Sequence, residues 1–137
     1  HPDCILTPHR GEFARLSPPA RGGDEEGVGA RAQKFAVKFQ CTILLKTPDA
    51  DLIAGPDGKV VKNLTGNQGM TKGGTGDVLA GLVAALFAKN DALTSAFVGA
   101  YINGKSGDAL FKKVGPFYNA EDLMEQVPKT LWKIYKK

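Results

Sequence analysis

A glycine-rich segment that runs straight into an apolar helix is the feature that most restricts what this chain can fold into. Gly66 to Asp77 contains five glycines, and the stretch from Val78 to Phe87 is small and apolar. Glycines let backbone N–H groups point inward around an anion, and a helix that opens near Asp77 directs the positive end of its dipole to the same place. The sequence therefore predicts a phosphate-binding loop at a helix start, with the Asp77 carboxylate at its rim.

An acid at the helix start separates this segment from the two commonest glycine-rich motifs. A P-loop carries Lys followed by Ser or Thr at this point, and a dinucleotide fingerprint spaces its glycines differently. A carboxylate among anion-binding amides opposes phosphate binding, so proton abstraction from a substrate hydroxyl is one explanation for Asp77. The other is an N-cap or first-turn acid that the helix dipole favours.

Composition limits the class of protein. A length of 137 residues suits one domain with one core. The 18 Lys and Arg exceed the 14 Asp and Glu only slightly and are dispersed, which fits an anionic small ligand and predicts no nucleic-acid partner. Cys4 and Cys41 are far apart, which favours free thiols in a reducing compartment. With no run of 18 apolar residues and no leader signal, we expect a cytoplasmic protein without a membrane span.

The first half of the chain reads as a strand, a helix and a second strand. Cys4 to Thr7 is a short strand signal, and apolar residues recur with helical spacing from Val28 to Gln40 after a polar loop over 17–29. Thr42 to Lys46 contains a continuous apolar run, typical of a central parallel strand that is covered on both faces. These segments predict a βαβ unit.

The second half begins with a hairpin and continues with helices. Gly55-Pro56-Asp57-Gly58 is a strong turn signal between strands at 52–54 and 59–62. The helix after the glycine loop has four small residues that leave room for close approach of a neighbour, namely Ala80, Gly81, Ala84 and Ala85. Further helices are expected over 92–113 and from Asn119 onward, with a kink or break at Pro128.

This order predicts an α/β protein with a partial doubly wound sheet and flanking helices. In such folds the functional site lies at the carboxyl ends of the strands. Thr7-Pro8-His9, Lys46 and the glycine loop each follow a predicted strand or strand pair. We therefore expect them to share one edge of the sheet.

Several motifs together resemble the ADP- or ATP-dependent NAD(P)H-hydrate dehydratases, which have a ribokinase-like fold. The matching segments, in order, are Thr7-Pro8-His9-Arg10-Gly11-Glu12-Phe13, Leu44-Leu45-Lys46, Asn63 to Asn67 and Gly69 to Gly81. The resemblance covers nearly the whole chain but only the C-terminal half of that family's domain. It implies that residues 1–137 are the C-terminal part of such a domain and need the missing N-terminal half, which agrees with a chain that opens at His1.

The resemblance also implies a repair reaction. Members of the family use a nucleotide to phosphorylate the hydroxyl of a hydrated nicotinamide ring and then eliminate phosphate, which restores NADH or NADPH. ADP or ATP is the expected phosphoryl donor, with a slight preference for ADP, and Mg²⁺ is expected to accompany it. No His and Cys set has metal-ligand spacing, so no protein metal site is predicted.

Residue by residue, the resemblance implies that Asp77 is the catalytic acid–base group and that it contacts the substrate together with His9. We expect Asn67 there as well, with an ordinary turn residue as the alternative. The expected nucleotide-binding residues are Lys46, Thr47, Gly73, Gly74, Thr75 and Gly76.

Three further side chains have two readings each. Glu12 either orients His9 or is a first-turn acid, and the second is favoured. Asn103 and Asp108 either approach the nucleotide or are exposed polar positions, and again the second is favoured.

Two other functions fit the same residues. A small-molecule kinase of the same fold, of hydroxymethylpyrimidine or sugar type, shares the Gly-Thr-Gly-Asp pattern. A non-catalytic nucleotide-binding module is the rival from a different class. For the dehydratase, a homo-oligomer is expected.

Overall fold

The computed structural model describes residues 4–19 and 27–136. Its strands are β1 (Ile5–Leu6), β2 (Thr42–Leu45), β3 (Asp51–Ala54) and β4 (Val60–Asn63). Its helices are α1 (Arg10–Leu16), α2 (Gly27–Phe39), η1 (Gln68–Met70), α3 (Thr75–Phe87), α4 (Ala92–Val114) and α5 (Ala120–Tyr135). The four predicted strands and the four predicted helices occur in the predicted order, and the structure also contains α1 and η1. The loop expected over 17–29 ends sooner, because α2 already begins at Gly27, and residues 20–26 of that loop lie outside the described part.

The strands form one sheet in the order β1-β2-β3-β4. β1 and β2 pair in parallel, with Ile5 opposite Thr42, as the βαβ unit requires. β2, β3 and β4 then pair antiparallel, so the sheet is mixed. The central place predicted for β2 is confirmed.

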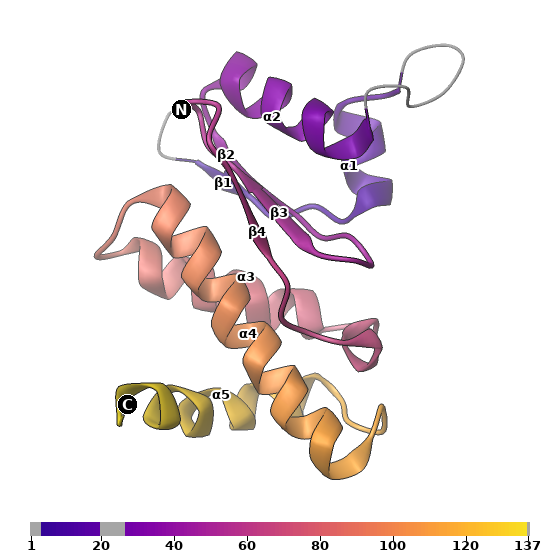
Figure 1. Ribbon diagram of the computed structural model, residues 1–137, viewed down its shortest axis with the longest axis vertical. Coiled ribbons are helices and arrows are strands. Elements are labelled where there is room, and N and C mark those ends of the chain that lie inside the picture. Colours follow the sequence, from indigo (N-terminus) through magenta and orange to yellow (C-terminus); the bar gives the residue numbers. More distant parts are fainter. Residues whose placement is uncertain (1–3, 20–26, 137) are drawn as a thin grey trace.

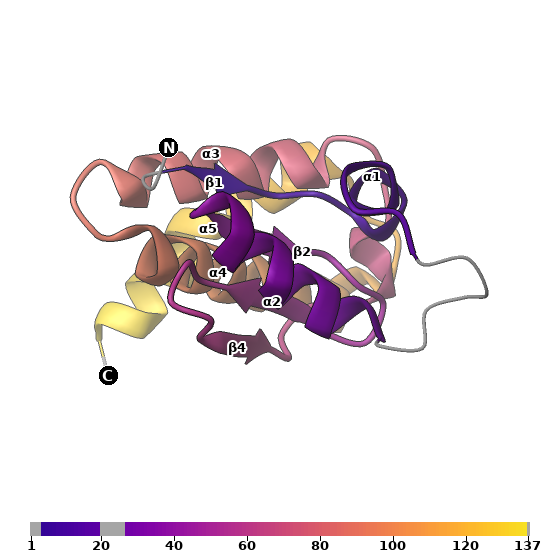
Figure 2. The same cartoon turned by 90° about the horizontal axis from the view of Figure 1, so that it is seen from above.

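Helices cover both faces of this sheet (Figure 1). α2 packs on β2 and β3 from one side, while α4 packs on β2, β3 and β4 from the other, beside α3. α5 packs against α4 and α3 on the side away from the sheet. Figure 2 shows the same layers from above, with α2 nearest the viewer. No helix in the described ranges is both long and apolar enough to cross a bilayer.

The protein has one hydrophobic core on each face of the sheet, and the apolar run of β2 contributes to both. Ile43 and Leu45 point to the α2 side, where they join Phe13, and Leu44 points to the side of α3 and α4, where it joins Leu79. All three β2 side chains are fully buried. Because side chains alternate along a strand, a strand buried on both faces is mostly apolar, and in β2 the one polar residue is its first, Thr42.

The predicted hairpin turn between β3 and β4 is confirmed. The Gly55 N–H donates to the Lys59 carbonyl at 2.8 Å, and Asp57 Oδ1 accepts the Lys59 N–H at 3.0 Å. Gly58 has a φ of 81°, which glycine adopts without steric cost.

One expectation about the helices is wrong, and of the kink or break expected at Pro128 the break does not occur. The small residues of α3, Ala80, Gly81, Ala84 and Ala85, are exposed, and the close approach of α3 and α4 is made instead by Gly99 of α4. α5 runs through Pro128 without a break. A proline removes only one hydrogen bond of the helix, and the packing of Leu123 and Thr130 holds the segment on both sides of it.

Gly99 and Gly81 give opposite predictions for substitution by alanine. A Cβ at Gly99 would lie 2.7 Å from Val83 Cγ2, whereas a Cβ at Gly81 meets nothing within 4 Å. We expect Gly99→Ala to lower the free energy of unfolding by about 1–3 kcal/mol through overpacking. Gly81→Ala, the matched control, should raise it by about 0.5–1 kcal/mol. Urea denaturation of the three proteins measures both changes, and equal effects would contradict this packing.

Candidate functional site

The glycine loop ends at the first residue of α3, which is Thr75. The expectation that the helix opens near Asp77 is therefore two residues late, and Asp77 lies third in the helix. The Thr75 hydroxyl is within hydrogen-bond distance of the carbonyls of Met70, at 2.7 Å, and Lys72, at 2.8 Å, which fixes the earlier start. Gly74 precedes it with a φ of 88°, and a Cβ there would lie 2.8 Å from Ala120 Cβ. Only glycine fits this position.

Backbone amides of the loop are left for a ligand. Within the described residues, the N–H groups of Gly73, Gly74 and Gly76 donate to no backbone carbonyl, whereas the Asp77 N–H donates to the Gly74 carbonyl at 3.0 Å. These amides stand at the positive end of α3. Such a helix start binds phosphate.

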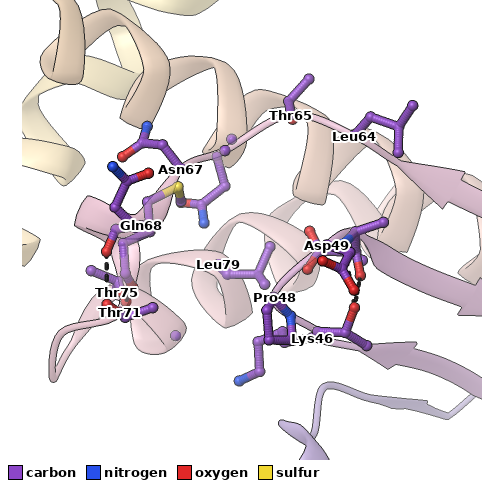
Figure 3. Close-up of a pocket in the computed structure, with 18 residues that line it drawn as sticks. Lys46, Pro48, Asp49, Leu64, Thr65, Asn67, Gln68, Thr71, Thr75 and Leu79 are labelled. Carbon is purple, nitrogen blue, oxygen red and sulfur yellow. Dashed lines mark hydrogen bonds between the residues drawn. The ribbon is translucent and has the colours of Figure 1, made fainter. Parts of the chain in front are cut away.

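A first cavity of about 440 Å³ lies between the loop after β2 and the glycine loop. Figure 3 shows Lys46, Pro48 and Asp49 on one side of it and Asn67, Gln68 and Thr75 on the other. Its volume lies within the range of about 300–1,000 Å³ that small-molecule sites occupy.

A second cavity of about 980 Å³ lies beside the first. It is lined by His9, Glu12, Gly74 and Asp77, none of which reaches the first cavity. The residues that line both cavities include Lys46, Thr47, Thr75 and Gly76. Of the residues expected at the nucleotide, Gly73 lines neither cavity.

His9 is held in place by α1, whose N-cap it forms. Its Nδ1 accepts the Glu12 N–H at 3.1 Å, and Glu12 Oε2 accepts the His9 N–H at 2.8 Å. The backbone hydrogen bond from His9 lowers the pKa of Glu12. Because Nδ1 is an acceptor, the proton of the neutral ring sits on Nε2, 3.4 Å from Glu12 Oε1. Glu12 is thus a first-turn acid that also orients His9.

Lys46 brings the ends of β1 and β2 together. It pairs with His9 as an isolated parallel bridge, and its N–H donates to the Pro8 carbonyl at 3.0 Å. A Cβ at Gly76 would lie 3.3 Å from Lys46 Nζ, so the ammonium group stands against the start of α3. The expected shared edge is confirmed, with a cation beside the free amides.

Two of the expected ligand residues use their polar atoms within the protein. The Thr47 hydroxyl donates to the Ala50 carbonyl at 2.6 Å and shapes the loop after β2. Asn67 Oδ1 accepts the Gly69 N–H at 3.0 Å and the Tyr118 hydroxyl at 2.8 Å. Asn67 lines the first cavity and not the second, so the structure does not bring it to His9 and Asp77. Its contact with substrate stays a prediction.

Two polar residues of the first cavity were not expected there, because the sequence favoured an exposed position for Asn103 and gave no role to Asp51. Asn103 is only 5% exposed, which overturns the expectation of an exposed position, and its Oδ1 has no partner among the described residues. Asp51, at the start of β3, also lines this cavity and bonds the Asn63 amide at 3.0 Å. Asp108 is half-buried and bonds Asn67. The helical pattern gave no signal for either α4 residue, because the glycine loop that covers them lies far away in the sequence.

Comparison with solved structures defines the class of fold. The chain superposes on the ADP/ATP-dependent NAD(P)H-hydrate dehydratase of Bacillus subtilis, co-crystallised with ATP and Mg²⁺, with a TM-score of 0.85 and 30% identity over 96% of this chain and 48% of that one. It superposes on a ribokinase of Thermotoga maritima with a TM-score of 0.61 and 19% identity, over 93% of this chain and 42% of that one. The fold is therefore ribokinase-like, as predicted.

The family follows from the sequence matches. The model of the NAD(P)H-hydrate dehydratase family matches residues 1–129, and the chain belongs to this family. It is 48% identical to the bifunctional NAD(P)H-hydrate repair enzyme Nnr of Archaeoglobus fulgidus, over 94% of this chain and 25% of that protein. It is 43% identical to the ADP-dependent (S)-NAD(P)H-hydrate dehydratase of Cenarchaeum symbiosum, over 94% of this chain and 45% of that protein. The chain thus spans less than half the length of these relatives.

Asp51 makes stability depend on pH. Burial raises the pKa of its carboxyl, against the opposing effects of the Asn63 hydrogen bond and the Lys46 charge. Its folded pKa therefore lies above the unfolded value of about 4, and the chain loses stability as the pH rises from below that value through the folded pKa. Asp51→Asn keeps an acceptor for Asn63 and cannot ionise.

We expect the stability of Asp51→Asn relative to the unchanged chain to rise between about pH 3 and neutral pH. Urea denaturation at a series of pH values measures this difference. A difference that is constant or falls with pH would show that burial does not dominate at Asp51.

Proposed function

We propose that this chain carries the nucleotide site and the catalytic carboxylate of an ADP- or ATP-dependent NAD(P)H-hydrate dehydratase. One observation carries the proposal. Gly76 lines both cavities, while the next residue, Asp77, lines only the second, together with His9. A phosphoryl donor in the first cavity and an acceptor hydroxyl in the second would therefore meet at the start of α3.

The first cavity suits the nucleotide. Its inner end offers the Gly76 amide, the positive end of α3 and the Lys46 ammonium, which together favour the terminal phosphate. Fixed amides and a cation also stabilise the charge that develops on a transferring phosphoryl group. The names of the relatives from Cenarchaeum symbiosum and Bacillus subtilis support ADP, or either ADP or ATP, as the donor.

The second cavity suits the hydrated nicotinamide ring. In the proposed reaction Asp77 accepts the proton of the ring hydroxyl, and the hydroxyl oxygen attacks the terminal phosphorus as the bond to the nucleotide breaks. Phosphate then leaves with the ring C–O bond electrons while the neighbouring ring carbon loses a proton, which restores the double bond of NADH or NADPH. His9 lines this cavity and would contact the substrate there.

Mg²⁺ fits this arrangement through the nucleotide. Among the described residues, no group of three or more His, Cys, Asp or Glu side chains is placed to hold a metal ion. Mg²⁺ commonly binds substrate phosphates and water with few protein ligands. The ion would neutralise phosphate charge beside Lys46.

The kinase and module alternatives are less well supported. A kinase of this fold needs the glycine loop and Asp77, but it does not account for the Pro8-His9-x-Gly11-Glu12 segment that lines the second cavity. An inactive module does not account for an acid at the junction of two cavities. The need for a further N-terminal half, the homo-oligomer and the cytoplasmic location stay predictions.

Direct assay separates these functions. The natural full-length polypeptide, incubated with hydrated NADH, Mg²⁺ and either ADP or ATP, should restore the near-ultraviolet absorbance of the reduced nicotinamide ring. Omission of the nucleotide is the control and should abolish the recovery. Nucleotide binding without recovery would refute the dehydratase and support the module, and phosphorylation of a hydroxymethylpyrimidine or sugar would support the kinase.

Asp77 can be tested against its alternative role as a first-turn acid. We expect Asp77→Asn in the full-length protein to lower turnover by roughly 10²–10⁴-fold, because a positioned general base is lost. Asp122→Asn is the matched control, since Asp122 also lies third in its helix, α5, and lines neither cavity. Comparable turnover in the two variants would remove Asp77 from the chemistry.

A further inference from the structure

One face of α4 receives the glycine loop at contact distance. An added Cβ at Gly104 would lie 2.0 Å from Thr65 Oγ1, and one at Gly107 would lie 2.5 Å from Met70 Sδ. Both glycines are buried. They stand about one helical turn apart, so the loop lies along the helix, and the residue that follows Gly107 is Asp108.

Asp108 binds this loop with both carboxylate oxygens. Its Oδ2 accepts the Gly66 N–H at 3.3 Å, and its Oδ1 accepts from Asn67 Nδ2 at 3.1 Å. Hydrogen bonds to an ionised acceptor are stronger than neutral ones. The side chain is half-buried and lines neither cavity. Asp108 therefore contacts the loop and neither of the two cavities.

Asn67 connects Asp108 to the next part of the glycine loop. Its Oδ1 accepts the Gly69 N–H at 3.0 Å and so caps η1. The last residue of η1, Met70, accepts a hydrogen bond from the Thr75 hydroxyl at 2.7 Å. Since Thr75 is the first residue of α3, direct contacts run from α4 to the amides at the start of α3.

A second set of contacts holds the loop from the connection between α4 and α5. The Tyr118 hydroxyl donates to Asn67 Oδ1 at 2.8 Å. Lys72 Nζ donates to the carbonyls of Pro116 and Tyr118 and lies 5.0 Å from the centre of the Tyr118 ring. The ammonium group of the loop is thus engaged with carbonyls, and the loop is held from two directions.

We infer that Asp108 is a positioning residue of the nucleotide site, which acts through Asn67 to fix the amides that receive the phosphoryl group. The inference rests on the proposed function. Removal of the carboxylate leaves the Gly66 N–H and the Asn67 amide without their acceptor. Catalysis by preorganised donors is sensitive to a displacement of about 1 Å. Loss of the Asp108 carboxylate should therefore lower the reaction rate although Asp108 does not contact the reacting groups.

The test uses the full-length protein with Mg²⁺ and ADP or ATP, at a temperature where every variant is folded. Asp108→Ala should lower kcat at saturating nucleotide by about 10–100-fold, and Asp108→Asn, which keeps one acceptor oxygen, should regain part of it. Hydrogen exchange at the amides of 66–71 should become faster in Asp108→Ala. Asn67→Ala combined with Asp108→Ala should lose less than the sum of the two single losses in activation free energy, because the two residues share one contact while the Gly66 N–H bond belongs to Asp108 alone.

Asp91→Ala is the matched control on the same helix. Asp91 caps the other end of α4, where its side chain accepts the Thr94 N–H at 2.9 Å, and it lines neither cavity. This variant should lower the melting temperature without a change in kcat below it. A purely structural role for Asp108 predicts the same behaviour in Asp108→Ala.

The outcomes separate this inference from the proposed function. Unchanged kcat in folded Asp108→Ala, or an equal loss in Asp91→Ala, overturns the positioning role. If Asp108→Ala does not fold, Asp108→Asn and Tyr118→Phe decide by the same kcat and exchange criteria. If the unchanged protein binds nucleotide but does not dehydrate, the proposed function fails, and weaker ADP or ATP binding with faster exchange in Asp108→Ala still supports the positioning role. Unchanged binding and exchange overturn it.

Discussion

Burial of β2 on both faces is the constraint on which the rest of the structure depends. Ile43, Leu44 and Leu45 are fully buried, so the sheet must be covered by helices on both sides. A strand enclosed in this way reaches polar surroundings only at its end, where Lys46 follows directly beside the end of β1. The site therefore forms where the core stops, and the cation and His9 are brought together by the same register that pairs the strands.

The two lysines of this region, Lys46 and Lys72, have different partners and therefore different roles. Lys46 stands against Gly76 and the free amides, where positive charge favours phosphate. Lys72 lies within the glycine loop itself but is bonded to carbonyls of the connection between α4 and α5. Proximity in the sequence to a phosphate-binding loop is therefore a poor guide to which cation faces the anion. The partners of each ammonium group decide.

The sequence was sufficient for features that depend on neighbouring residues. The apolar run of β2, the Asp57-Gly58 turn and the start of α5 next to Asn119 each contain their own physical cause, and each prediction is confirmed. Features that depend on contacts between residues far apart in the sequence could not be predicted. Asn103 is buried because the loop after β4 covers α4, and α3 begins early because the Thr75 hydroxyl reaches carbonyls of the preceding loop. Neither contact leaves a periodic pattern in the chain.

The first turn of α3 shows how three adjacent residues can carry three different tasks. Successive residues of a helix point about 100° apart. Thr75 is therefore turned inward, where it is 7% exposed and bonded to the loop, Gly76 lines both cavities, and Asp77 faces only the second. The carboxylate stands at the same helix start as the free amides without lining the cavity that suits the nucleotide. An acid that would weaken anion binding inside the first cavity is thereby kept beside it, where the proposed reaction would need a proton acceptor.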